Sequence, residues 1–150
     1  MSSNKLKLNS DKTELLLIAS QFCPKPQLSS LNVCGDQISP SVSVRNVGVG
    51  FDSHIKFEGQ VSSICKASFF HIRNISRIRK YLSKENSKIV VHVFVTCRLD
   101  NANALLYGLP KYLIAKLQAV LNCAARLTLC KQKYDHATPL LIQLHWLSCA

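Results

Sequence analysis

Carboxylates are scarce in this sequence of 150 residues, which holds 8 Asp and Glu against 19 Lys and Arg. They are spread widely, no Asp-Asp doublet occurs, and the only near pair is Asp11 and Glu14. Two-metal phosphoryl transfer needs clustered carboxylates to hold both ions. The phosphate loop Gly-x-x-x-x-Gly-Lys, the Gly-x-Ser-x-Gly elbow and the His-Glu-x-x-His zinc motif are missing as well. We therefore expect no catalytic residue, no metal site and no cofactor in this chain.

Long apolar runs are also missing. The longest ones, residues 15–19 and 89–95, fall short of the roughly 18 residues that span a bilayer, and the N-terminus has no signal-peptide core. We expect an intracellular protein, cytoplasmic or nuclear, with no membrane partner. The 7 cysteines form no Cys-x-x-Cys pair and single out no Cys–His nucleophile, so free, buried thiols are expected rather than a zinc site.

The positive charge is concentrated in the C-terminal part of the chain. Residues 1–58 hold six Lys/Arg and five Asp/Glu, a net charge of +1, whereas residues 59–150 hold thirteen and three, a net charge of +10. This imbalance favours a polyanionic partner for residues 59–150. A surface kept basic only for solubility is the alternative.

Short apolar segments and turn residues in the N-terminal third predict strands. We expect strands within 12–20, closed by a turn at 23–26, and within 28–33. The alternating Val and Phe residues of 42–51 predict one half-buried strand with a bulge near Gly48.

From about residue 57 the apolar period changes from two to 3.6, which predicts a long helix to about residue 82. Its apolar face comprises Val61, Ile64, Ser68, Ile72, Ile75 and Leu82, with Ile78 at the border. On a helical wheel four cations fall within roughly 60° of one another on the opposite side. We call them the basic stripe: Lys66, Arg73, Arg77 and Lys80. Arg79 does not fit, because it projects towards the apolar side; either it extends its charge to water or the helix ends before it.

Further helices are expected downstream. Ser83 is a good N-cap, and the following segment 88–97 is read as a helix although its β-branched residues leave a strand open. Pro110 starts another helix, and a short one runs from Thr138 to Trp146. The predicted fold class is α+β, with a small antiparallel sheet followed by a bundle of about four helices.

The basic stripe is the candidate binding site. With Asn74 beside it and Phe69, Phe70, His71 and Tyr81 flanking it, the stripe would track a phosphate backbone. The alternative is that the aromatic residues belong to the core and the stripe is the solvated face of an amphipathic helix.

Six phrases along nearly the whole chain resemble, in the expected order, the region after the active site in LINE-type (non-LTR) reverse transcriptases, especially the jockey-like families. They are Asn4 to Glu14, similar to N-x-L-x-L-N-x-x-K-T-E; Val44 to Asp52, similar to V-x-x-L-G-V-x-x-D; Ile55 to Phe70, similar to the start of the thumb; Arg98 to Pro110, similar to R-L-D-Y-C-N-x-L-L-Y-G-L-P; Gln118 to Arg126, similar to Q-x-x-x-N-x-A-A-R; and His136 to Leu147, similar to H-I-T-P-x-L-x-x-L-H-W-L-P.

The resemblance implies that residues 1–57 are the strand-rich end of a palm with a primer-grip-like segment, and that residues 58–150 form a helical thumb-like segment. In such polymerases the thumb holds the template–primer duplex. The metal-binding Tyr-x-Asp-Asp box, through which the parent enzyme would use Mg²⁺, is absent here. Asn101-Ala102 also replaces the usual Tyr-Cys of the family. The implied function is a non-catalytic fragment of a retrotransposon RNA-directed DNA polymerase, with an RNA/DNA duplex and the remainder of the polymerase as partners. A stand-alone small basic nucleic-acid-binding domain and a protein-interaction domain are the alternatives.

Overall fold

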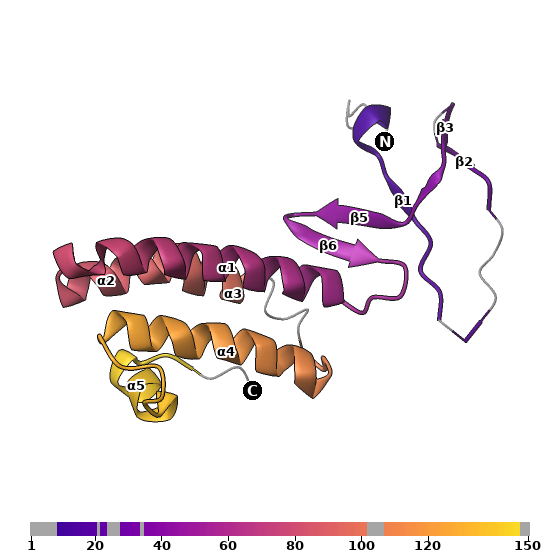
Figure 1. Ribbon diagram of the computed structural model, residues 1–150. Coiled ribbons are helices and arrows are strands. Elements are labelled where there is room, and N and C mark those ends of the chain that lie inside the picture. Colours follow the sequence, from indigo (N-terminus) through magenta and orange to yellow (C-terminus); the bar gives the residue numbers. More distant parts are fainter. Residues whose placement is uncertain (1–8, 21, 24–27, 34, 102–106, 148–150) are drawn as a thin grey trace. The chain divides into compact units, whose positions relative to one another are not determined.

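The computed structural model describes residues 9–20, 22, 23, 28–33, 35–101 and 107–147. The chain divides into two compact units, Met1–Gly59 and Gln60–Ala150. All described strands lie in the first unit, and the second unit is helical, so the fold class is α+β as predicted (Figure 1).

The described part of the first unit forms three pairs of short strands after a 3-10 turn, η2 (Ser10–Lys12). The pairs are β1 (Leu15–Leu16) with β4 (Pro40–Ser41), which are parallel, and two antiparallel hairpins, β2 (Leu31–Val33) with β3 (Asp36–Ile38) and β5 (Ser43–Asn46) with β6 (Val49–Asp52). The strands predicted within 12–20 and 28–33 are therefore present but shorter than expected. Of the turn expected at 23–26, residues 24–26 lie outside the described part.

The single bulged strand predicted over 42–51 is wrong, because the chain reverses at Val47-Gly48. Asn46 of β5 pairs with Val49 of β6, which leaves a loop of two residues. Val47 and Gly48 have φ angles of 49° and 84°. Positive φ at both central residues is what a type I′ hairpin turn requires. Glycine accepts this conformation freely, whereas it strains a β-branched valine.

Polar contacts close the first unit after β6. The Asp52 carboxylate accepts hydrogen bonds from the backbone N–H groups of His54 (3.0 Å) and Lys56 (2.9 Å), which stabilises a turn at this point. The imidazole Nδ1 of His54 lies 2.9 Å from the carbonyl oxygen of Ala19, just after β1. Phe51 and Phe57 pack edge to face, with ring centroids 5.6 Å apart.

The long helix predicted from residue 57 is present as α1 (Glu58–Ile78), followed by a 3-10 turn, η3 (Arg79–Tyr81). Its buried residues are Val61, Ile64, Ser68 and Ile75, all on the predicted apolar face. Glu58 in the first turn and Arg77 in the last have the charges that the helix dipole favours.

The ambiguous segment 88–97 is helical. It comprises the end of α2 (Lys84–Val91), a π-helical segment, η4 (His92–Thr96), and the start of α3 (Cys97–Asp100). The predicted cap forms: the Ser83 hydroxyl accepts a hydrogen bond of 3.1 Å from the backbone N–H of Asn86.

The π segment has a cause in the sequence. Ser87, Val91, Val95 and Leu99 are all buried, at a constant spacing of four residues. On an α-helix of 3.6 residues per turn, each such step drifts by about 40°, so the four side chains would leave a common face. The wider i→i+5 turn offsets this drift and keeps them on one side.

Two helices complete the second unit: α4 (Lys111–Thr128), capped by Pro110, and α5 (Ala137–Leu144). Helix α4 buries Leu113, Leu117, Val120, Leu121 and Ala124. The last helix ends two residues earlier than expected, because His145 has a left-handed φ of 57° and the Trp146 N–H returns to the Leu141 carbonyl oxygen (2.9 Å).

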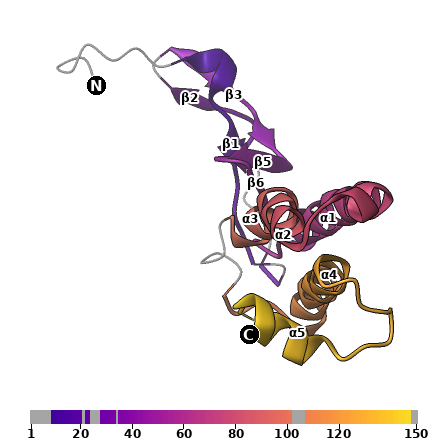
Figure 2. The ribbon, with the colours of Figure 1, turned by 90° about the vertical axis from the view of Figure 1, so that its left-hand side faces the viewer.

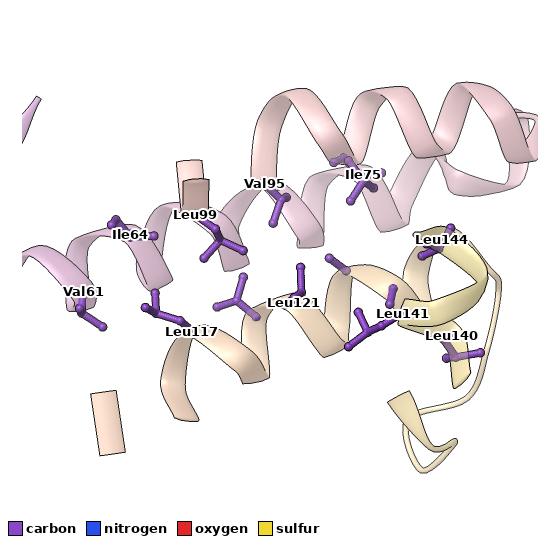
Figure 3. Close-up of a cluster of buried hydrophobic side chains, with 14 of the residues drawn as sticks. Val61, Ile64, Ile75, Val95, Leu99, Leu117, Leu121, Leu140, Leu141 and Leu144 are labelled. Carbon is purple, nitrogen blue, oxygen red and sulfur yellow. The ribbon is translucent and has the colours of Figure 1, made fainter. Parts of the chain in front are cut away.

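Within the helical unit, α1 and α4 run alongside each other, and the α2–α3 segment returns antiparallel to α1 (Figures 1 and 2). Their facing sides form one hydrophobic core. Figure 3 shows its members: Val61, Ile64 and Ile75 from α1; Val95 and Leu99 from the π segment and α3; Leu117 and Leu121 from α4; and Leu140, Leu141 and Leu144 from α5. No helix among the described residues has the length and apolar character needed to cross a membrane.

Candidate nucleic-acid interface

All four residues of the basic stripe are exposed. Lys66, Arg73 and Arg77 lie on α1, and Lys80 lies on η3 directly after it. The helix places them on the side opposite the buried face, because that face takes the apolar residues into the core. The structure thus shows that all four side chains are exposed and that three of them lie on one α-helix; the binding of nucleic acid by the stripe stays a prediction.

The charge of the stripe is not balanced by neighbouring residues in the sequence. Between Glu58 and Glu85 the chain contains no Asp or Glu. Arg73 and Arg77 are four residues apart, a spacing at which like charges on a helix repel by a few tenths of a kcal/mol, roughly 0.2–0.5. A polyanion placed along this face would remove that repulsion. Helix α1 and η3 therefore present a positive ridge suited to a row of phosphates.

The aromatic residues that flank the stripe are on the surface. Phe69 is 41% exposed, Phe70 61% and Tyr81 77%, so the alternative that assigned them to the core is wrong for these three residues. The Lys80 ammonium lies 4.8 Å from the centroid of the Tyr81 ring, a cation–π contact. Exposed rings among cations are the residue types that bind both bases and phosphates of a nucleic acid.

His71 is partly buried and connects α1 to the π segment. Its ring stacks on Phe94, with centroids 5.2 Å apart and an interplanar angle of 29°, and meets Phe70 edge to face at 5.5 Å. Sequence reasoning missed Phe94, because the π segment changes the phase of the helix just before it. A series of ring contacts thus runs from Phe70, beside the stripe on α1, through His71 to Phe94 on the π segment.

Arg79 does not belong to the basic stripe, because its side chain binds the backbone within the helical unit. Its guanidinium donates three hydrogen bonds to backbone carbonyl oxygens: Nε to Leu127 (3.1 Å), Nη2 to Thr128 (2.8 Å) and Nη1 to Leu82 (2.8 Å). The first two carbonyls belong to the last turn of α4, where the helix dipole favours a cation. The Leu127 carbonyl oxygen also accepts a longer hydrogen bond, of 3.3 Å, from the backbone N–H of Cys130. The projection of Arg79 towards the apolar side, which seemed a misfit in the sequence, is the geometry that joins the end of α1 to the end of α4.

The described residues include several side chains of the types that could bind a metal ion or act as a nucleophile. No group of three or more His, Cys, Asp or Glu side chains within 9–20, 22–23, 28–33, 35–101 and 107–147 is arranged to hold a metal ion. Five cysteines are free in this part of the chain. Cys23, Cys97 and Cys130 are exposed, contrary to the expectation of buried thiols. Burial raises the pKa of the Cys65 thiol, with nearby Lys116 opposing the rise, so this group is held as a thiol and not as the nucleophilic thiolate.

Comparisons with protein-family models, with curated proteins and with solved structures find no match for this chain.

Proposed function

We propose that this chain is a non-catalytic segment of a LINE-type retrotransposon reverse transcriptase, and that its helical unit binds a template–primer duplex weakly and without regard to sequence. The observation that carries the proposal is the basic stripe: Lys66, Arg73, Arg77 and Lys80 are all exposed on one face of α1 and η3. The ordered phrases that resemble such polymerases support the same assignment, since a helical thumb follows the palm in that family.

The binding would be electrostatic. Four cations that neutralise phosphates release condensed counterions, so the logarithm of affinity should fall with the logarithm of salt concentration at a slope of about −3 to −4. Between 50 and 200 mM salt this slope corresponds to a loss of affinity of about 100-fold. Nothing in such contacts reads the bases, so RNA/DNA duplexes of different sequence should bind alike.

The test is fluorescence anisotropy with a labelled RNA/DNA duplex across that range of salt. Reversal of Arg73 and Arg77 to Glu should abolish measurable binding, because it changes the charge of the stripe by four units. The helix should persist, since both side chains are exposed and neither joins the core; far-UV circular dichroism checks this.

Lys131→Glu/Lys133→Glu is the matched control. Both lysines are exposed in the segment between α4 and α5, and the variant changes the net charge of the chain by the same amount. It should keep most of the affinity and the salt slope. Equal losses of affinity in the two double variants would show that binding depends only on the net charge of the chain. Unchanged binding in the stripe variant would reject the basic stripe as the binding site.

The absence of polymerase chemistry is tested separately. The purified chain, supplied with template–primer, nucleotides and Mg²⁺, should incorporate no nucleotide, because its carboxylates form no cluster that would hold two metal ions. Template-dependent incorporation that survives purification would overturn this part of the proposal. The origin of the chain is tested by reading the coding sequence upstream of Met1 for a Tyr-x-Asp-Asp box.

A protein-interaction domain is the second candidate, favoured by one feature of α2 and the π segment. Ile89 and Val93 are 61% and 53% exposed and stand four residues apart, on one side of this helical segment. Ile89→Lys/Val93→Lys should leave duplex binding unchanged if the first proposal holds. A self-association of the chain that this variant removes, in the absence of any duplex binding, would favour the second candidate.

A further inference from the structure

The surface beside the basic stripe carries a row of three rings from two different helical segments. Phe70 of α1 meets His71 edge to face at 5.5 Å, and His71 stacks on Phe94 of η4 at 5.2 Å. The two outer rings remain open to solvent, with 61% of Phe70 and 44% of Phe94 exposed. We call these three residues the aromatic row.

The aromatic row borders the stripe along α1. Phe70 is four residues after Lys66 and three before Arg73, so each cation is its neighbour on the helix surface. His71 continues the row away from the stripe and is braced by its stack on Phe94. Anchoring through His71 limits the freedom of both outer rings, which reduces the entropy that either would lose on binding a flat partner.

Positive charge predominates in the stretch of sequence that carries the row. From residue 59 to residue 99 the sequence contains eight Lys or Arg residues and a single carboxylate, Glu85. A partner that meets both surfaces at once needs flat apolar groups for the rings and closely spaced negative charges for the cations. Unpaired nucleotides have both, since each base presents a π-face and each is followed by a phosphate.

Duplex bases do not satisfy this description, because they are stacked inside the helix and present only their edges. We infer that the aromatic row binds unpaired bases of a single-stranded nucleic acid, by stacking on Phe70 and Phe94, while the basic stripe holds the adjoining phosphates. The inference rests on the proposed function, in which the stripe binds phosphates, and it extends the ligand from a duplex to a strand or overhang whose bases are free. Phe94 belongs to a π-helical turn, a local departure from the α-helix that is frequent at functional sites.

The test compares oligothymidylate of 20 nucleotides with a blunt RNA/DNA duplex of 20 base pairs, both at low salt. Phe70→Leu/Phe94→Leu removes the two outer rings and keeps apolar side chains of similar size. It should weaken oligothymidylate binding about tenfold, within the range known for base–aromatic stacking, and change duplex binding less than twofold. Tyr107→Leu/Tyr134→Leu, which removes two exposed rings that lie on neither α1 nor η4, should change neither affinity.

The stripe variant separates the two proposals. Arg73→Glu/Arg77→Glu should weaken both ligands, because both use the same cations. Suppose that the stripe variant loses both ligands while Phe70→Leu/Phe94→Leu binds oligothymidylate as before. This result overturns the inference that the aromatic row binds bases, and it leaves the proposed function standing. Unchanged binding of both ligands in the stripe variant overturns the proposed function itself.

A direct readout covers the case in which the leucine variant does not fold. Oligothymidylate carrying 5-bromodeoxyuridine is irradiated with the unaltered chain, and the crosslinked peptides are identified by mass spectrometry. Crosslinks at Phe70 or Phe94 support the inference, and crosslinks confined to other residues overturn it. Polyglutamate that competes with oligothymidylate as effectively as unlabelled strand would also overturn it, because an acidic polypeptide supplies charge without bases.

Discussion

Arg79 joins the ends of two helices, so its replacement should destabilise the helical unit far more than its position in the sequence suggests. In Arg79→Met the side chain keeps an unbranched apolar stem but loses its charge and all three hydrogen bonds. The Thr128 carbonyl oxygen then loses the donor that Arg79 supplied, and the Leu127 carbonyl oxygen keeps the longer hydrogen bond from the Cys130 N–H (3.3 Å). Thr128 itself is fully buried, which limits the access of water to its carbonyl.

The magnitude follows from the geometry. A hydrogen bond to a charged group contributes about 1.5–3 kcal/mol net, and three independent ones would give roughly 5–9 kcal/mol. Two effects reduce that sum. The arginine side chain recovers up to about 2 kcal/mol of rotamer entropy when released. In addition, Leu82 is only half-buried, so water can replace the guanidinium at its carbonyl. We therefore expect a loss of about 2–4 kcal/mol in the free energy of unfolding.

The assay is urea denaturation followed by far-UV circular dichroism. With a slope of about 1.5 kcal/mol per molar urea, a loss of 3 kcal/mol lowers the midpoint by about 2 M. Arg77→Met is the control, because Arg77 is exposed two residues earlier and its replacement should stay within about 0.5 kcal/mol of the unaltered chain. Arg79→Lys should fall between the two, since it keeps the charge but not the three-way geometry. Equal midpoints for Arg79→Met and Arg77→Met would refute the proposed role of Arg79 in joining the ends of α1 and α4.

Two further predictions concern single positions. The Ser87 hydroxyl is buried in α2 without a hydrogen-bond partner, so Ser87→Ala should raise the free energy of unfolding by about 1 kcal/mol. Ser83→Ala removes the cap of the same helix and should lower the free energy of unfolding by about 1 kcal/mol. A urea midpoint that falls in Ser87→Ala, or one that rises in Ser83→Ala, would contradict the corresponding assignment. At the β5–β6 turn, Val47→Asn should stabilise the hairpin by about 1 kcal/mol, because asparagine tolerates positive φ. Hydrogen exchange of the hairpin amides should slow about fivefold, while the exposed control Val42→Asn should give no such slowing.

Local patterns in the sequence predicted several elements because their causes are local. The 3.6-residue period of residues 61–75 requires a helix with one buried face, whatever packs against it. The same period fixes the opposite face, so the exposure of Lys66, Arg73 and Arg77 could be predicted together with the helix. The Ser83 cap forms within three residues of its own position and was predicted for the same reason.

The alternation of apolar residues over 42–51 led to the wrong prediction of one continuous strand through Val47-Gly48. A hairpin with a turn of two residues keeps the period of two on both sides of the turn, so periodicity cannot distinguish it from one bulged strand. The positive φ at Val47 shows the reversal, and β-branched residues are so rare in that conformation that the sequence did not suggest it.

The sequence by itself determined the α+β class, the long amphipathic helix and the position of the basic stripe on its solvent side, since each depends on residues within a few turns of one another. Only the tertiary structure decided the role of Arg79, whose partners on α4 lie 48 and 49 residues away. It also decided that Phe70 and Tyr81 are exposed, and that Phe94 joins His71 across two helical segments. A helical wheel gives the direction of a side chain but not what occupies that direction, and only packing between segments supplies the neighbour.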